Sequence, residues 1–370
     1  MRVQLVDPRG DVRPYDHALG AALARQGAQV ELVTSPFVYG RVAAGDGYSV
    51  SERFYRRSAR YGEEARLRRR AARLVEHFPD MLRFRRDPGP ADVRHYQWLP
   101  LEALDVRLLP GGRPRVMTLH NVIRRGGGRR ATWTVRRLAK AMDAVVVHTR
   151  HGARLLDELG AGGHVRVIPH GAFEHLTRQR DEAPLPPELA AVEGPVLLCF
   201  GMVRPYKGVE VLLEAFRELE GAELWVVGRP LKGSMEPYEK LARRAPGRVR
   251  FVTRYVSERE LPAYFRRADL VVLPHRSVDQ SGVLYVAMAF GKAIVLSAVG
   301  GFREAVEDHD VGRLVPPGDA PALAAALRAL LDDPAERGAM GRRAAAAASG
   351  PYSWDEVGRQ TLRLYEDLRQ

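Results

Sequence analysis

The sequence predicts an α/β protein built from two doubly wound halves, each a parallel sheet with helices on both faces. Short apolar stretches alternate with helical patterns, and this alternation is typical of parallel β-sheets. The alternation stops in a proline-rich, charged segment at residues 178–195 and then restarts. A chain of 370 residues is also too long for one comfortable core, so two domains are expected.

The N-terminal half begins with an apolar strand, a helical pattern through His17, Leu19 and Leu23, and a turn at Gly27. Further apolar runs follow along this half, each short enough for a buried strand. The strands expected here are Val3–Val6, Val30–Thr34, one around Val93, Val116–Leu119, Ala144–His148 and Val165–Ile168.

The C-terminal half repeats the pattern after the segment 178–195, which is interpreted as an interdomain linker. Residues 1–180 and 187–350 are therefore expected to form the two domains. A helix at about 353–370, after Gly350-Pro351, is expected to pack back on the first domain. The strands expected in this half are Val196–Phe200, Glu223–Val227, Val249–Val252, Leu270–Leu273 and Ala293–Leu296.

The composition describes an ordinary globular protein with an unusual charge. Hydrophobic residues make up 45% and charged residues 28% of the chain. The single cysteine, Cys199, excludes a disulfide framework and a multi-cysteine metal site. No apolar run reaches the length that spans a bilayer, and the N-terminus has the pattern of a strand, so a cytoplasmic location is expected.

The net charge of +13 comes mainly from arginines that cluster in the N-terminal half. Such clusters suit anionic lipid headgroups, a phosphorylated acceptor or nucleic acid, although a solvated helical face is an equally good explanation. No helix-turn-helix, zinc-finger or RNA-binding aromatic motif accompanies them, so specific nucleic-acid binding is not expected. The clusters comprise Arg53, Arg56, Arg57, Arg60, Arg66, Arg68, Arg69, Arg70, Arg83, Arg85 and Arg86, and then residues 124–130, Arg136, Arg137 and Lys140.

The stretch 200–216, FGMVRPYKGVEVLLEAF, predicts a phosphate-binding loop. An apolar strand runs into Gly201, then Arg204 and Lys207, and then a helical repeat that starts at Val209. Free backbone N–H groups and the helix dipole both favour negative charge at such a helix start. An ordinary surface loop is the alternative, but strand, cations and helix stand in the order that phosphate binding requires.

Several motifs along nearly the whole chain resemble one known family. It is the retaining nucleotide-sugar glycosyltransferases with two Rossmann-like domains facing a central cleft (the GT-B fold), the group 1 family that includes bacterial mannosyl- and glucosyltransferases and sucrose synthases. The motifs are RPYKG (204–208), DQSGVLYVAMAFGKAIVLSAVGGFREAV (279–306), DVGRLVPPGD (310–319), DVRHYQWLP (92–100), VMTLHNV (116–122) and VIPHG (167–171).

The resemblance implies transfer of a sugar from a nucleotide-diphosphate sugar to an acceptor hydroxyl, with retention of configuration and without a metal. Arg204 and Lys207 would stabilise the leaving diphosphate, and backbone N–H groups at a second helix start would assist them. The acceptor would be a sugar, a lipid-linked molecule or another hydroxyl compound, as in glycan, exopolysaccharide or glycolipid assembly. Further donor contacts are expected at Gly10, Gly201, Gly228, Tyr255, Val256, Ser281, Gly282 and Val283.

One triplet, Asp308-His309-Asp310, has the Asp-x-Asp spacing that metal-dependent transferases of another fold use. It is expected in a glycine-bounded turn and not to hold a metal. The anchoring of the donor is therefore predicted to be metal-independent, and no cofactor is expected besides the donor itself.

The chain departs from the family pattern at two acidic positions. Where the family commonly has two glutamates, this sequence has Val278 and Val286. Asp279 is adjacent to the first position and is expected to replace it, with a plain turn former as the alternative. Nothing obvious replaces the second glutamate, so the ribose contacts and the base of the donor stay open.

Histidines at strand ends are the candidates in the N-terminal half. His120 follows the strand Val116–Leu119, and its family counterpart lies near the transferred sugar. His95 is an even choice between a functional and a structural role, and His170 is expected to be structural. His17 and Gly10 lie where the family places acceptor contacts, although the usual glycine pair is absent.

Other functions stay open on the sequence alone. A catalytically inactive nucleotide-sugar-binding relative would fit the missing glutamates. A nucleotide-sugar 2-epimerase shares the fold but would need acid–base carboxylates in the cleft. The sequence identifies neither the donor sugar nor its acceptor, and a peripheral position on the inner face of the membrane is compatible with the arginine clusters.

Overall fold

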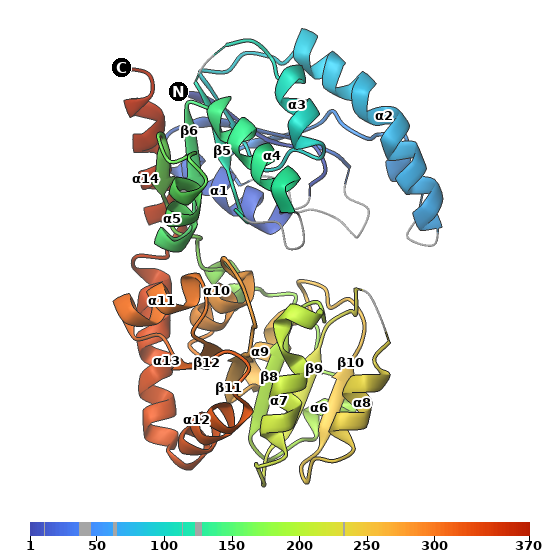
Figure 1. Ribbon diagram of the computed structural model, residues 1–370, viewed down its shortest axis with the longest axis vertical. Coiled ribbons are helices and arrows are strands. Elements are labelled where there is room, and N and C mark those ends of the chain that lie inside the picture. Colours follow the sequence, from blue (N-terminus) through green and yellow to red (C-terminus); the bar gives the residue numbers. More distant parts are fainter. Residues whose placement is uncertain (11, 37–45, 62–64, 113, 123–127, 232–233) are drawn as a thin grey trace. The chain divides into compact units, whose positions relative to one another are not determined.

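The computed structural model covers residues 1–370 and describes all of them except 11, 37–45, 62–64, 113, 123–127 and 232–233 (Figure 1). The chain divides into two compact units. Unit 1 comprises Met1–Pro169 and Trp354–Gln370, and unit 2 comprises His170–Ser353. These limits differ from the domain limits expected from the sequence, 1–180 and 187–350, because the segment after residue 169 packs on unit 2.

Unit 1 contains a parallel sheet with the strand order β3-β2-β1-β4-β5-β6-β7. The chain builds outward from β1 to β3 and then returns to place β4 on the other side of β1. The boundary between β1 and β4 is therefore the topological switch point, where ligands of such sheets bind beyond the carboxyl ends of the strands. The strands are β1 (Arg2–Asp7), β2 (Gln29–Thr34), β3 (Ser49–Glu52), β4 (Val93–Tyr96), β5 (Arg115–Thr118), β6 (Ala144–Val147) and β7 (Val165–Val167).

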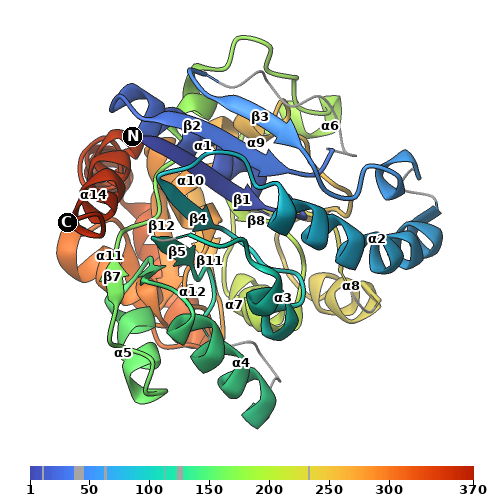
Figure 2. The ribbon, with the colours of Figure 1, turned by 90° about the horizontal axis from the view of Figure 1, so that it is seen from above.

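Helices surround this sheet, and the C-terminal helix α14 packs against the first helix α1. The two helices approach closely, since a Cβ atom added to Gly358 would lie 3.0 Å from the Cβ atom of Ala22. Both views place α14 and the long helix α2 at opposite sides of unit 1 (Figures 1 and 2). The helices of unit 1 are α1 (Arg13–Arg25), α2 (Arg66–Arg86), α3 (Glu102–Leu108), α4 (Gly128–Lys140), α5 (Arg150–Glu158) and α14 (Trp354–Asp367), with a 3-10 turn η1 (Ser58–Arg60).

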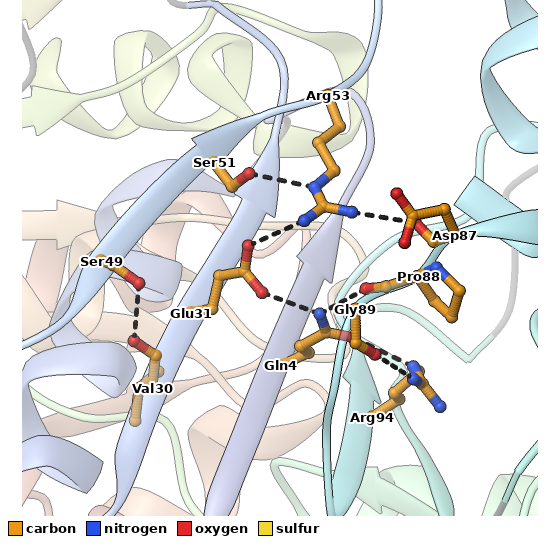
Figure 3. A network of polar contacts seen from close by, with 10 residues as sticks. All are labelled: Gln4, Val30, Glu31, Ser49, Ser51, Arg53, Asp87, Pro88, Gly89 and Arg94. Atoms are coloured by element: carbon orange, nitrogen blue, oxygen red, sulfur yellow. Dashed lines mark hydrogen bonds and ion pairs between the residues drawn. The ribbon is translucent and has the colours of Figure 1, made fainter. Parts of the chain in front are cut away.

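A polar network on the sheet ties the loop after α2 to the strands (Figure 3). Gln4 donates to Glu31 at 2.8 Å and to the Pro88 carbonyl at 2.6 Å. Arg53 donates to the Asp87 carbonyl at 3.0 Å, and Arg94 donates to the Gly89 carbonyl at 2.8 Å. Arg53 directly follows strand β3. The side chains of β3 are largely exposed and its sequence has no apolar run, so this strand was not expected from the sequence.

Unit 2 contains a second parallel sheet with the order β10-β9-β8-β11-β12-β13. Its switch point lies between β8 and β11. The prediction of two doubly wound parallel sheets is confirmed, and β13, only three residues long, is the strand that the sequence analysis missed in this unit. The strands are β8 (Val196–Phe200), β9 (Glu223–Val227), β10 (Val249–Val252), β11 (Leu270–Leu273), β12 (Ala293–Ser297) and β13 (Arg313–Val315).

The core of unit 2 lies between the sheet and helices such as α7 and α12, which supply Leu212, Phe216 and Leu327, all fully buried. Cys199 is buried in β8, and burial raises the pKa of its thiol to about 11. The helices are α6 (Pro187–Ala190), α7 (Val209–Phe216), α8 (Glu236–Ala242), α9 (Leu261–Arg267), α10 (Gly282–Ala289), α11 (Gly301–His309), α12 (Ala320–Asp332) and α13 (Pro334–Ser349), with 3-10 turns η3 (Glu174–Arg178) and η4 (Pro205–Lys207).

The segment expected as a linker, 178–195, is bound to unit 2 along its length. Arg259 pairs with Asp181 at 3.0 Å and Arg266 pairs with Glu182 at 3.0 Å. The Ala183 N–H donates to the Arg259 carbonyl, and Arg267 donates to the Val192 carbonyl. The residues 178–195, rich in proline and charge, therefore form a surface segment that is bound to the rest of unit 2 and not a free linker.

Candidate functional site

Two loops meet at the switch point of unit 2, one after β8 and one after β11. Gly208, with φ at +65°, lies directly against the second loop, because a Cβ atom there would lie 2.0 Å from the Pro274 carbonyl oxygen. The Arg276 N–H donates to the Tyr206 carbonyl at 2.8 Å. The predicted phosphate loop and the loop that leads to α10 therefore form one joined edge of the sheet.

Lys207 is buried in this edge, with only 7% of its surface exposed. Its Nζ donates to the Phe200 carbonyl at 3.4 Å. A Cβ atom on Gly201 would lie 2.8 Å from that Nζ, so a glycine is needed for the ammonium group to lie there. Gly201 itself has φ at +103°, and a Cβ atom on Gly228 would lie 2.2 Å from its carbonyl oxygen. The structure thus brings Lys207, Gly201 and Gly228 together.

Arg204 lies at the start of η4, half-buried, and its guanidinium carbon is 6.0 Å from the centre of the Tyr206 ring. Its Nη2 contacts the Met202 sulfur at 3.8 Å. The buried Nε has no hydrogen-bond acceptor among the described residues. A buried donor of this kind is normally hydrogen-bonded, which makes an anionic ligand the natural acceptor.

A second helix start lies after β11, as the sequence predicts. Ser281 is the N-cap of α10 in an extended conformation, and its side chain makes no capping hydrogen bond. Gly282 and Val283 occupy the first turn, where backbone N–H groups have no partner within the helix. Asp279 precedes them, half-buried, and its carbonyl accepts the Gly301 N–H at 2.9 Å.

Tyr255 and Val256 follow β10 at the same edge of the sheet. The Tyr255 side chain is 53% exposed, whereas Val256 is 9% exposed. The Asp308-His309-Asp310 triplet, expected in a turn, instead forms the C-terminal end of α11, where Asp310 adopts a left-handed conformation and pairs with Arg343. The expectation of a turn was wrong because Asp308 and His309 belong to the helix, which ends at His309 with Asp310 as its C-cap. Within the described residues, no three His, Cys, Asp or Glu side chains gather as they would around a metal ion.

In unit 1, His120 follows β5 and is 95% buried among aromatic and histidine rings. The Tyr15 ring meets it edge-on at 4.7 Å, and its Nδ1 lies 3.2 Å from the His148 Nε2. Burial lowers the pKa of His148 to about 4, and its Nδ1–H donates to the Ile168 carbonyl at 3.0 Å. Neutral His148 must therefore accept at Nε2, so His120 donates from Nδ1.

Gln97 is a residue that the sequence reasoning missed. It follows β4, its N–H donates to the Val6 carbonyl of β1 at 2.9 Å, and it therefore lies at the switch point of unit 1. The side chain is fully buried, yet neither amide atom has a hydrogen-bond partner among the described residues. An amide directly after a strand was the available signal, but its burial becomes visible only in the fold.

The other histidines have structural contacts. His95 is buried and bridges the Tyr365 hydroxyl at 2.6 Å and the Thr118 hydroxyl at 2.7 Å, and burial lowers its pKa to about 3. It therefore serves the packing of α14. His170 stacks on Tyr285 with 4.6 Å between ring centres, in agreement with a structural role.

The region where the family places acceptor contacts has a compact loop after β1. Gly10 has φ at +62°, and its N–H donates to the Asp7 carbonyl at 3.2 Å. His17 lies in α1 and is hydrogen-bonded to the Tyr48 hydroxyl, and burial lowers the pKa of His17 to about 4. The predicted site residues thus form two groups, one at the switch-point edge of each unit's sheet.

Comparison with known proteins identifies both halves of the chain. The family model "Glycosyl transferases group 1" matches residues 194–333, and the model "Glycosyltransferase Family 4" matches residues 15–172. A D-inositol 3-phosphate glycosyltransferase of Kineococcus radiotolerans is 32% identical over 62% of this chain and 58% of its own length. The chain therefore spans little more than half of that relative in the alignment.

A second relative is matched more completely. A D-inositol 3-phosphate glycosyltransferase of Xylanimonas cellulosilytica is 31% identical over 72% of this chain and 68% of its own length. Among solved structures, Anabaena Alr3699/HepE, determined in complex with UDP-glucose, superposes with a TM-score of 0.70 and 18% identity over the full length of both chains. This likeness shows the two-domain GT-B fold. The sequence matches show that the chain belongs to the group 1 glycosyltransferases.

Proposed function

We propose that this protein transfers a sugar from a nucleotide-diphosphate sugar to an acceptor hydroxyl. The observation that carries the proposal is the buried Lys207 beside Gly201, at the switch point where α7 begins. A buried ammonium group beside a glycine and at a helix start is a favourable place for an anion, because its positive charge is poorly screened by water there. Membership in the glycosyltransferase family and the UDP-glucose bound to HepE favour the diphosphate of a donor as that anion.

The leaving diphosphate would be stabilised without a metal ion. Lys207 and Arg204 supply fixed positive charge, and the first-turn N–H groups of α10, at Gly282 and Val283, supply further donors. Preorganised cations and helix N-termini of this kind act where negative charge develops on the leaving group. Gly201 and Gly228 permit the close approach of the backbone, and Asp279 and Ser281 would contact the sugar and diphosphate from the neighbouring loop.

The transfer would retain the configuration at the anomeric carbon. The acceptor hydroxyl would approach on the face of the leaving group, and a phosphate oxygen would accept its proton. His120 would accept a hydrogen bond from a sugar hydroxyl through Nε2, because its Nδ1–H is engaged by His148. Gln97, buried with an unsatisfied amide at the switch point of unit 1, would bind a hydroxyl of the acceptor or the sugar.

The acceptor class is proposed from the relatives and the charge. The relatives named above carry the name of an enzyme acting on a phosphorylated inositol, and a chain of net charge +13 suits an anionic or lipid-linked acceptor. We place the protein in the cytoplasm at the inner face of the membrane, in glycan or glycolipid assembly. The family matches favour this activity over a 2-epimerase.

The test is a screen of the purified protein against nucleotide sugars with uridine, guanosine and adenosine bases, in the presence of EDTA. Release of free nucleoside diphosphate is measured with and without candidate acceptors, including inositol phosphate. Turnover with one donor, lost in Lys207→Ala, is the expected result. Retained turnover in Lys240→Ala, an exposed lysine of the same unit, would exclude a general effect of losing a lysine.

Two results would count against the proposal. If EDTA abolishes turnover and a divalent cation restores it, the metal-independent site is wrong although transfer stands. If the protein neither turns over nor binds any nucleotide, the assignment of the donor site to the loop after β8 is wrong.

A further inference from the structure

The outer face of α2 carries a continuous stripe of exposed apolar side chains. They recur at the three- and four-residue intervals that place side chains on one face of a helix. We call this set the α2 apolar face. It consists of Leu67 (83% exposed), Leu74 (63%), Val75 (76%), Phe78 (44%) and Leu82 (39%).

The opposite face of α2 is held firmly by polar contacts with unit 1. His77 is 3% exposed and bridges Asp105 at 2.7 Å and the Tyr55 hydroxyl at 2.6 Å. Asp80 accepts the Tyr55 N–H at 2.7 Å, and Glu76 accepts the Ser58 N–H at 2.8 Å. These contacts fix the rotation of the helix about its axis, so the apolar face is turned outward by the fold itself.

The charge of α2 is strongly positive. Its 21 residues include eight arginines, against the two acidic residues Glu76 and Asp80, for a net charge of +6. Both acidic side chains are engaged by backbone N–H groups on the inner side. Exposed arginines remain near both ends of the apolar face, namely Arg68, Arg70, Arg85 and Arg86.

We infer that the α2 apolar face docks onto the surface of a bilayer that contains anionic lipids. A helix with an apolar stripe and flanking arginines lies in the interface plane, with its apolar side chains among the acyl chains and its cations at the headgroups. Anionic headgroups attract such cations. No helix in the described part of the chain is long and apolar enough to cross a bilayer, so the contact is one of surface docking.

Charge complementarity favours a membrane over the other occupants of an exposed apolar face. A second copy of α2 would bring two helices of charge +6 together, which like-charge repulsion opposes. Nucleic acid would match the arginines but would leave the exposed leucines in water. An anionic bilayer satisfies both the arginines and the apolar side chains at once.

The inference names the surface by which the protein would lie at the membrane, as the proposed function suggests. Only the biological purpose of the docking rests on that proposed function. Binding to vesicles needs neither donor nor acceptor. A protein that binds vesicles but transfers no sugar would contradict the proposed function alone, and a protein that transfers sugar but binds no vesicles would contradict this inference alone.

The test is vesicle flotation of the full chain with phosphatidylcholine alone and with phosphatidylcholine mixed with phosphatidylglycerol. The expected result is binding to the anionic vesicles that weakens as salt is raised. The double variant Leu74→Gln and Val75→Gln keeps good helix formers on an exposed surface and should reduce binding about tenfold or more. Leu104→Gln, at a leucine of α3 that is also exposed (45%), is the control and should bind like the wild type.

Charge is tested separately. Arg70→Glu should weaken binding to anionic vesicles, whereas Arg363→Glu, an exposed arginine on α14 at the opposite side of unit 1, should not. Equal binding of the double variant and the wild type would overturn the inference. So would equal binding to both kinds of vesicle, self-association through α2 seen by light scattering, or binding to DNA without binding to vesicles.

Discussion

At the scale of single residues, the candidate donor site depends on where glycines allow a cation to lie. Lys207 is buried at the end of β8 because Gly201 has no Cβ atom that would occupy its place. Its neighbour Arg204 lies half-buried with an unsatisfied Nε. In unit 1, single contacts with His148 and Tyr15 fix the orientation of the His120 ring. In both units, the informative signal is a polar side chain that the fold buries at the end of a strand.

Gln97 offers a direct test at this scale. Gln97→Met keeps the volume of the side chain and removes a buried amide that has no partner among the described residues. We expect the free energy of unfolding to stay unchanged or rise, because an unsatisfied polar group is lost. We expect sugar transfer to fall about tenfold or more if the amide binds a substrate hydroxyl.

The matched control is Gln4→Met. Gln4 is as deeply buried but is bonded to Glu31, Pro88 and Arg94 (Figure 3). Its loss should lower the free energy of unfolding by about 1–3 kcal/mol, measured by urea denaturation. A Gln97→Met protein that loses stability as Gln4→Met does, and keeps full activity, would show that the Gln97 amide is structural.

At the scale of elements, strands and the loops behind them position the site. The loops after β8 and β11 are joined where Gly208 lies against Pro274. This contact has two requirements, a positive φ and the absence of a side chain. The sequence shows the glycine of RPYKG but gives no sign that its neighbour is the loop after β11, since the two loops are far apart in the chain.

Gly208→Ala separates these requirements when compared with Gly221→Ala. Both glycines have positive φ, at +65° and +71°, but a Cβ atom at Gly221 meets nothing within 4 Å. Gly221→Ala should therefore cost only the backbone strain, about 1–2 kcal/mol. Gly208→Ala should cost about 2 kcal/mol more, because the Pro274 carbonyl must move. Urea denaturation of both variants measures the difference, and equal losses would show that the two loops are not held together at this point.

At the scale of the whole molecule, the sequence predicted the fold class and most strands, because buried parallel strands are continuous apolar runs. It missed β3, whose side chains are largely exposed, and β13, which is three residues long. It placed a linker at 178–195, where proline and charge in fact mark a segment docked on unit 2. Arg204 and Lys207 follow β8, and Asp279 and Ser281 follow β11, the two strands that border the switch point of unit 2. Gln97 and the α2 apolar face could not be predicted, since both depend on which side chains the tertiary structure buries.

The most direct test of the central claim is the affinity of a nucleoside diphosphate for the loop after β8. Calorimetric titration with UDP and with GDP, in EDTA, compares the wild type with Lys207→Met, which keeps the buried stem and removes the charge. Lys240→Met, at an exposed lysine of the same unit, is the control. Loss of one charge-assisted hydrogen bond of about 1.5–3 kcal/mol predicts a Kd raised about 10- to 100-fold in Lys207→Met and an unchanged Kd in Lys240→Met. Equal affinities of Lys207→Met and the wild type, or binding that appears only when a divalent cation is added, would contradict the account.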